Sequence, residues 1–349
     1  MVVIMELREV YKLIDSKLKT IDFNELWEGF YPFDFALYDQ DTVYLKDHEI
    51  VKDSRFIGNT AIVHNDNYLA IWNSEGIERV DINVLTAKII HEMFHAYQYV
   101  KLERRFPDEI NAIFNYNYDS LNLSVKYEEH KLLSELIDNY SQEKFNELID
   151  LKIYRKNINK YANYESQIEV VEGMAQYVEM LALRKLDIDL YTKYLNNIKN
   201  RLLDKNKLIP IRHICYDSGA VTLLLCHDHN INIKHNLGEE SKTIDDLLIN
   251  KYYRERDIIV EEDQDIVEIV NEYIEETKKI IENKIKNVSP IKVNYRLTGF
   301  DPFNARRYYD FIYCPHFVGV IENGNFVPFI GDYVIFVESG WIKEMYKVS

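Results

Sequence analysis

Residues 89–97 read Ile-Ile-His-Glu-Met-Phe-His-Ala-Tyr, a pattern that sets two histidines in an otherwise apolar segment. His91 and His95 are four positions apart and therefore lie on the same face of an α-helix, where both imidazoles can reach one metal ion. Glu92 lies beside them, near the place of a metal-bound water. The neighbouring positions are uncharged, which favours a buried metal-binding helix over two incidental core histidines.

The third ligand that catalytic zinc requires must come from another part of the chain. Gln98 and Lys101 stand where metzincins carry a glycine and a third histidine, so that class is excluded. Glu172 is the best candidate, and Glu169, one turn earlier, is the alternative. Both belong to a polar stripe at helical spacing that comprises Glu165, Glu169, Glu172, Gln176 and Glu179.

Two small residues distinguish the surroundings of Glu172 from an ordinary solvated acidic stripe. Gly173 and Ala175 stand beside it in mid-helix, where glycine is unfavourable by about 1 kcal/mol relative to alanine. A close approach between this helix and another would explain that choice. We therefore predict Glu172 as the third ligand. Glu179 is the first candidate to orient a ligand imidazole, and Gln176 the second.

Two further blocks of sequence extend the pattern. Residues 172–179 read Glu-Gly-Met-Ala-Gln-Tyr-Val-Glu, and residues 216–220 read Tyr-Asp-Ser-Gly-Ala. With residues 91–95, they resemble the gluzincin metallopeptidases, specifically the catalytic domain of zinc aminopeptidases. That family carries His-Glu-x-x-His, then Asn-Glu-Gly-x-Ala-x-Tyr-x-Glu, then Tyr-x-Lys-Gly-Ala. The resemblance implies a zincin-like, thermolysin-like catalytic domain that binds Zn²⁺, with Tyr216 stabilising the oxyanion.

The chain also departs from the aminopeptidase pattern. Val171 replaces the asparagine of the second block, and Ser218 replaces the lysine of the third. The 77 positions from His95 to Glu172 exceed the family's short spacing, so helices must be inserted between the two motifs. The Gly-x-Met-Glu-Asn segment that anchors a substrate's free amino group has no counterpart before His91. Exopeptidase and endopeptidase action therefore both stay open.

The predicted reaction is hydrolysis of an amide bond by a metal-activated water. Zinc lowers the pKa of a bound water to ~7, and Glu92 takes its proton and later protonates the leaving amine. The expected substrate is a peptide or protein. One alternative is a zinc hydrolase of a non-peptide amide or ester. Another is a non-catalytic binding protein on a zincin scaffold, which the intact Glu92 disfavours.

Hydrophobic periodicity predicts an α+β fold that is mostly helical. We expect residues 1–80 to form a helix and a small sheet, in which the strand Tyr68 to Asn73 can pair its exposed edge with an extended peptide. Residues 81–288 should form the helical zinc-binding catalytic region. Residues 289–349 alternate in hydrophobicity and should form a small β-rich unit that packs against the helices.

Two helices of the central region can be bounded from the sequence. Asp81 can cap the N-terminus of the His91 helix, which should run from about Ile82 to Val100. Residues 261–286 carry one apolar stripe at helical spacing, which predicts an amphipathic helix that packs on another part of the protein.

Composition constrains the partners and the compartment. The chain has 58 acidic and 42 basic residues and a formal net charge of -16, which disfavours binding to nucleic acid or an anionic membrane. No stretch approaches the ~18 consecutive apolar residues of a membrane helix, and the N-terminus lacks the pattern of a secretory signal. Three cysteines are too few for a disulfide framework. We expect a soluble cytoplasmic protein.

Overall fold

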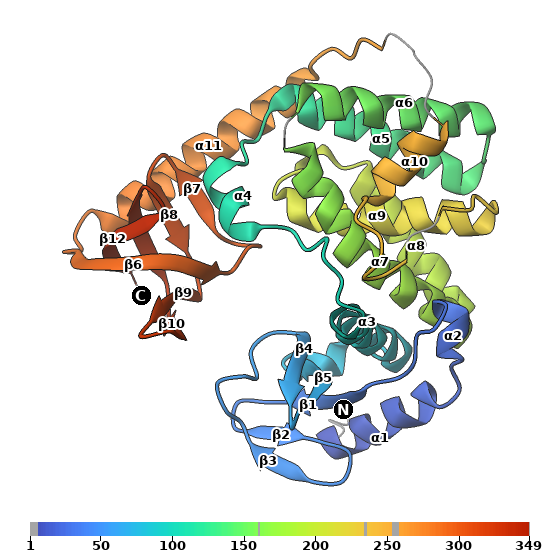
Figure 1. Cartoon of the computed structure of the whole chain (residues 1–349), viewed down its shortest axis with the longest axis horizontal. Coiled ribbons are helices and arrows are strands. Elements are labelled where there is room, and N and C mark those ends of the chain that lie inside the picture. Colours follow the sequence, from blue (N-terminus) through green and yellow to red (C-terminus); the bar gives the residue numbers. More distant parts are fainter. Residues whose placement is uncertain (1–5, 160, 234–235, 253–257, 349) are drawn as a thin grey trace. The chain divides into compact units, whose positions relative to one another are not determined.

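The computed structural model describes residues 6–159, 161–233, 236–252 and 258–348, and about half of the chain is helical (Figure 1). The expected mixture of helices and strands, with a β-rich C-terminal part, is confirmed. Within these ranges no helix has the length and apolar character needed to cross a bilayer. Each of two compact units combines separate stretches of chain. The first contains Met1–Phe106, Ser166–Arg201 and Cys215–Lys251, and the second contains Pro107–Glu165, Leu202–Ile214 and Tyr252–Ser349.

The first unit begins with two helices and a five-stranded sheet of order β3-β2-β1-β5-β4. Strands β1 and β5 are parallel, and the other neighbours are antiparallel. Helix α3 packs against β4, β5 and helix α1. The elements are α1 (Leu7–Leu18), α2 (Phe23–Leu26), β1 (Asp34–Tyr38), β2 (Thr42–Tyr44), β3 (Glu49–Val51), β4 (Thr60–His64), β5 (Asn67–Asn73), η1 (Ile77–Arg79) and α3 (Ile82–Val100).

The strand predicted at Tyr68 to Asn73 exists as β5, but the prediction that its edge is exposed is wrong. β5 pairs with β1 on one side and with β4 on the other, so both of its edges are occupied. The chain first forms β4, turns through Asn65 and Asp66 at positive φ, and returns as β5 beside β1. The edge strand on this side of the sheet is therefore β4, and β3 forms the opposite edge.

Helix α3 has the predicted bounds, Ile82–Val100. The Asp81 carboxylate accepts a hydrogen bond from the backbone N–H of Asn83 at 2.7 Å and so caps the first turn. The apolar residues around the two histidines, among them Ile90 and Phe94, are fully buried. Burial on several faces explains why this helix lacks the polar stripe of a surface helix.

Helices α7 (Ala162–Leu186), α8 (Ile188–Leu202), α9 (Ile211–Asp228) and α10 (Ile244–Tyr252) supply the later residues of the first unit. The predicted close approach at Gly173 is confirmed. A Cβ on Gly173 would lie 2.8 Å from the Cα of Gly219, and a Cβ on Gly219 would lie 2.6 Å from the backbone oxygen of Glu169. Helices α7 and α9 therefore touch backbone to backbone, which explains the mid-helix glycines.

The second unit combines helices with a seven-stranded antiparallel sheet of order β10-β9-β6-β12-β11-β8-β7. Ile110, Ile113 and Phe114 of α4 pack on the core of this sheet, and α11 contacts β7, β8 and β11. The elements are α4 (Glu109–Asn115), α5 (Ser120–Asp138), α6 (Gln142–Ile158), η2 (Lys205–Lys207), α11 (Gln264–Ile285), β6 (Ile291–Phe300), β7 (Arg306–Tyr308), β8 (Phe311–Cys314), β9 (Phe317–Glu322), β10 (Asn325–Ile330), β11 (Tyr333–Glu338) and β12 (Trp341–Lys347). The C-terminal strands thus pack on helices, as expected.

Candidate metal centre

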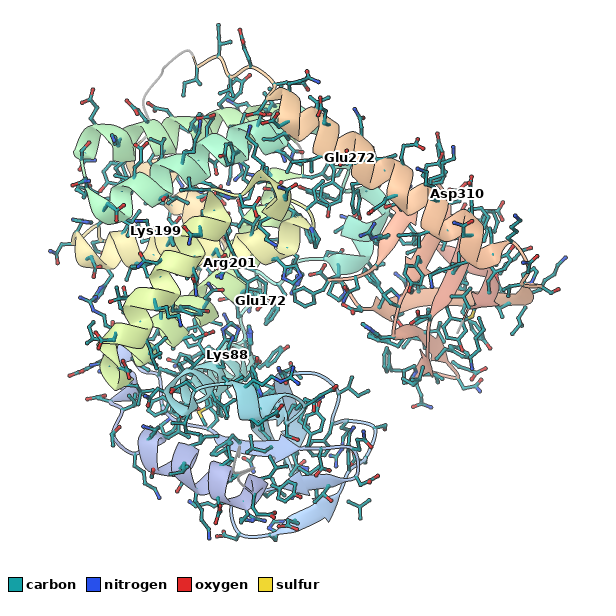
Figure 2. All side chains as sticks on the ribbon, turned by 180° about the vertical axis from the view of Figure 1, so that it is seen from behind. Lys88, Glu172, Lys199, Arg201, Glu272 and Asp310 are labelled. Atoms are coloured by element: carbon teal, nitrogen blue, oxygen red, sulfur yellow. The ribbon has the colours of Figure 1, made fainter. Side chains whose placement is uncertain are left out.

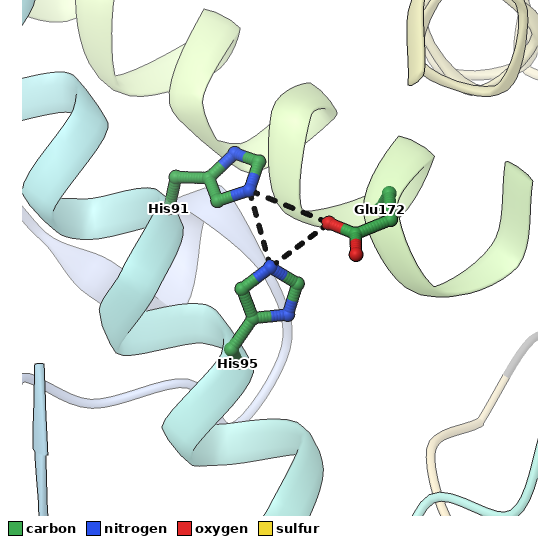
Figure 3. Close-up of side chains that lie close together, drawn as sticks. All are labelled: His91, His95 and Glu172. Atoms are coloured by element: carbon green, nitrogen blue, oxygen red, sulfur yellow. Dashed lines mark hydrogen bonds and ion pairs between the residues drawn. The ribbon is translucent and has the colours of Figure 1, made fainter. Parts of the chain in front are cut away.

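Three side chains from two helices of the first unit converge at one point (Figure 3). His91 and His95 project from one face of α3, and their Nε2 atoms lie 3.2 Å apart. Glu172 approaches from α7, with its Oε2 3.1 Å from Nε2 of His95 and 3.8 Å from Nε2 of His91. We call these three residues the metal centre. Across the described part of the chain, it is the only such group with metal-ligand geometry.

The geometry of the metal centre fits a tetrahedral ion. Two ligand atoms at ~2.0–2.1 Å from such an ion are about 3.3 Å apart. The three observed separations, 3.1, 3.2 and 3.8 Å, lie around that value. Two imidazoles and one carboxylate form a donor set that suits zinc and leaves a fourth position for water or substrate. The residues present therefore fit a catalytic zinc ion.

Glu169, the alternative third ligand, points elsewhere. Its carboxylate accepts a hydrogen bond from the hydroxyl of Ser218 on α9 at 2.6 Å. The same contact gives Ser218, which stands where the aminopeptidase pattern has a lysine, a place in the packing of α7 on α9. The structure therefore brings Glu172 to the two histidines and leaves Glu169 outside the metal centre.

The orientation of His91 depends on Glu179, as the acidic stripe suggested. Nδ1 of His91 lies 3.0 Å from Oε2 of Glu179, while Oε1 of Glu179 accepts a hydrogen bond from Tyr194 at 2.9 Å. Burial raises the pKa of Glu179, but the charge of Lys88, 3.7 Å away, and the bond from His91 outweigh burial and lower it to about 2. Lys88, which is labelled in Figure 2 together with Glu172, thus helps to keep Glu179 ionised. An ionised carboxylate can only accept hydrogen bonds, so Nδ1 of His91 carries the hydrogen and its Nε2 faces the metal position.

The orientation of His95 depends on Gln98, a role that the sequence analysis missed. The Gln98 amide nitrogen donates to the backbone oxygen of Val171 at 2.8 Å, which turns the amide oxygen toward Nδ1 of His95, also at 2.8 Å. The amide oxygen can only accept a hydrogen bond, so Nδ1 of His95 carries the hydrogen and its Nε2 is available to bind a metal ion. Gln98 is fully buried and links α3 to the residue just before Glu172.

Gln176, the second candidate to orient an imidazole, does not do so. Its amide nitrogen donates to the Asp217 carboxylate at 2.7 Å, and Arg201 donates to the same carboxylate at 2.7 and 2.8 Å. Gln176 therefore fixes α7 against α9 and contacts neither His91 nor His95 through a hydrogen bond.

The charges of the metal centre favour binding of a cation. Burial lowers the pKa of His91, but the carboxylates of Glu172 and Glu179 outweigh burial and raise it to about 10. The pKa of His95 is also raised, because Glu172 outweighs the effect of burial. The carboxylates thus favour the protonated form of both imidazoles, and a metal ion competes with those protons. Metal binding therefore releases protons and weakens as the pH falls.

Glu92 lies between the two histidines on α3 and is buried. Burial raises its pKa, and the carboxylates of Glu172 and Glu179 add to that rise against the opposing effect of His91 and His95. A carboxylate with a raised pKa is better suited to accept and return a proton near neutral pH. This is the environment expected of the predicted general base.

Tyr216 lies on α9 beside the metal centre. Its half-buried ring is nearly parallel to the His91 ring, with the centroids 6.3 Å apart and an interplanar angle of 10°. By contrast, the ring of Tyr177 packs against Trp27 and His227. Of these two tyrosines, Tyr216 has the ring that stacks on a proposed ligand.

Comparisons with known proteins give this chain no relative. No family model, no curated protein and no solved structure matches it.

Proposed function

We propose that this chain is a zinc-dependent peptidase of the gluzincin type, with a zincin-like catalytic unit. The proposal rests on one observation above all: the Nε2 atoms of His91 and His95 and Oε2 of Glu172 meet within 3.8 Å of one another. Each imidazole has a hydrogen-bond acceptor on its other nitrogen, as metal-ligating histidines normally do.

Zinc bound here would supply a Lewis acid that polarises a carbonyl and makes a water molecule more acidic. Glu92 accepts the proton from that water and delivers it to the leaving nitrogen, which its buried position and raised pKa favour. Tyr216 donates a hydrogen bond to the oxygen on which negative charge develops. Glu179 and Gln98 hold the imidazoles at fixed angles throughout the reaction.

A peptide is the favoured substrate because of the edge strand β4. Helix α3, which carries both histidines, packs directly against β4 and β5. An extended peptide can add to an exposed strand edge through its backbone, whatever its side chains are. The acidic composition and the few cysteines further favour a cytoplasmic enzyme that acts on peptides or proteins, with neither nucleic acid nor membrane as a partner.

Two other functions use the same residues. A zinc hydrolase of a non-peptide amide or ester would need the same metal centre and Glu92, but not the β4 edge. A binding protein on a zincin scaffold would need no general base, so the buried Glu92 would have no role in it. Substrate screening separates the first alternative from peptidase action, and loss of turnover in a Glu92 variant excludes the second.

The experiment that tests this proposal joins metal analysis to a peptide library. The purified chain should contain about one zinc per molecule and cleave members of the library. Glu92→Gln should retain the zinc but cleave about 10²–10⁴-fold more slowly, because it cannot accept the proton. Glu9→Gln, which changes an exposed glutamate of α1, should match the parent. Full turnover by Glu92→Gln, or a parent chain without affinity for zinc, would refute the proposal.

A further inference from the structure

A separate cavity of about 420 Å³ lies wholly within the second unit. It is bounded by α4, α11, the sheet and the first residues of α7 and α9, which belong to the second unit, and it has no residue in common with the metal centre. Its volume is in the range of small-molecule sites, ~300–1,000 Å³. Its walls are rich in aromatic residues, among them Tyr116, Tyr118, Tyr164, Tyr273, Phe300 and Tyr308.

Three tyrosines of this wall are held in place by hydrogen bonds. The Tyr116 hydroxyl donates to Glu165 at 2.8 Å, and the Tyr164 hydroxyl donates to Glu109 at 2.7 Å. The Tyr118 hydroxyl accepts from the backbone N–H at the start of α9 at 3.4 Å. These bonds fix the ring planes before any ligand arrives, so binding costs little side-chain entropy.

The cavity carries one net positive charge. Glu109, Arg212 and Arg307 are the charged residues that line it. Glu109 and Arg212 form an ion pair. Arg307 donates to the backbone oxygens of Tyr309 at 2.7 Å and Ile113 at 3.4 Å. No carboxylate in the described part of the chain forms a salt bridge with Arg307, so its charge is left for an anion.

We infer that this cavity binds a small aromatic carboxylate, with its ring among the tyrosines and its carboxylate on Arg307. Aromatic rings pack edge to face or offset against such walls, and a guanidinium forms charge-assisted hydrogen bonds with a carboxylate. An aromatic cation is disfavoured because two guanidinium groups face a single carboxylate. A free aromatic acid and the C-terminal aromatic residue of a polypeptide share this chemistry.

The test is calorimetric titration of the full chain with 3-phenylpropanoate and with 3-phenylpropanamide, which keeps the ring but lacks the charge. The acid should bind about tenfold more tightly, the effect of one charge-assisted contact. Arg307→Gln should abolish this preference, and Arg307→Lys should keep part of it. Arg296→Gln, which changes an exposed arginine of β6 outside the cavity, should behave as the parent. Circular dichroism checks that each variant is folded.

A second arm separates this cavity from the metal centre, because carboxylates also bind zinc. His95→Ala removes a proposed zinc ligand and should leave the preference for the acid unchanged. Equal affinity for acid and amide in the parent, or loss of the preference in His95→Ala, would overturn the inference. A pentapeptide ending in phenylalanine, compared with its amide, identifies the source. A preference for the free carboxylate would indicate a polypeptide terminus, and binding of 3-phenylpropanoate alone would indicate a free acid.

Discussion

The two units each bury a cluster of charged side chains, but the clusters are arranged differently. In the first unit, His91, His95 and Glu172 direct acceptor atoms at one shared point. In the second, Arg155 lies between two carboxylates, 2.6 Å from Glu129 and 2.7 Å from Glu165. Lys126 and Lys152 add contacts at 3.2 and 3.6 Å. We call this second cluster, Lys126, Glu129, Lys152, Arg155 and Glu165, the ion network.

The comparison shows that buried charge alone does not indicate a metal site. In the ion network every carboxylate has a cationic partner from the protein, and those partners lower the pKa of Glu165 against the effect of burial. In the metal centre, the Nε2 atoms of the two imidazoles and a carboxylate oxygen of Glu172 face one another, an arrangement that a metal ion can bridge. The distinguishing feature of the metal centre is therefore that three potential ligand atoms converge on one point.

The largest expected effect tests which carboxylate completes the metal centre. Glu172→Ala leaves two imidazole ligands and should lose bound zinc and peptidase activity together. Glu169→Ala is the matched control, since Glu169 lies one turn away and bonds to Ser218, and it should retain zinc. Zinc content by mass spectrometry of the folded variants decides. Zinc lost from Glu169→Ala and kept by Glu172→Ala would reverse the assignment.

The next largest effect concerns the ion network. Arg155→Met leaves Glu129 and Glu165 buried without their main partner, which should lower the free energy of unfolding by about 3–5 kcal/mol. Lys131→Met breaks an exposed pair with Glu128 on the same α5 and should change it by less than about 0.5 kcal/mol. Urea denaturation measures both. Similar small changes in the two variants would contradict the picture of a tightly paired cluster.

Tyr216→Phe should lower kcat by roughly 10²-fold or more, because a hydrogen bond made mainly in the transition state is lost. Zinc content and KM should stay nearly unchanged. Tyr177→Phe is the control. The ring of Tyr177 packs on Trp27 and His227, so removal of its hydroxyl should not lower kcat in this way. Steady-state kinetics on a verified substrate decides. Full turnover by Tyr216→Phe would show that another group donates to the oxyanion.

Gln98→Ala should weaken zinc affinity by about 10–100-fold, the usual cost of removing a group that orients a ligand imidazole. Gln176→Ala is the control, because this buried glutamine bonds to Asp217 and to neither ligand histidine. Competition with a fluorescent chelator measures both affinities. Equal affinity in Gln98→Ala and the parent would show that His95 is oriented without its help.

The smallest effect is a pH dependence that arises in the second unit. Burial, with Lys126, Arg155 and Lys152 close by, holds the pKa of His130 well below its usual value of 6.5. The unfolded chain therefore binds a proton below pH ~6.5 that the folded chain does not, and stability falls as the pH falls, by at most about 1.4 kcal/mol per pH unit. His130→Leu should flatten the profile between pH 6.5 and 5, and the exposed-site control His48→Leu should not. Parallel profiles for all three proteins would contradict it.

Local sequence signals predicted part of the structure. The Asp81 cap and the apolar residues around His91 gave the bounds of α3, and Gly173 correctly indicated a helix contact. These features depend on spacing and backbone sterics within a few residues. Val171, whose backbone oxygen holds the Gln98 amide, is 73 positions away. The role of Gln98 in orienting His95 therefore depended on how α3 packs on α7. The order of β4 and β5 likewise depended on pairing with β1, which is not a local property.

The metal centre is tested most directly by crystallography of the zinc-loaded chain, with anomalous scattering recorded at the zinc absorption edge. We expect one strong peak at ~2.0–2.2 Å from Nε2 of His91, Nε2 of His95 and a carboxylate oxygen of Glu172. The ion network should show no peak, because its carboxylates already bind protein cations. Zinc bound elsewhere, with the three side chains of the metal centre holding no ion, would contradict the central claim.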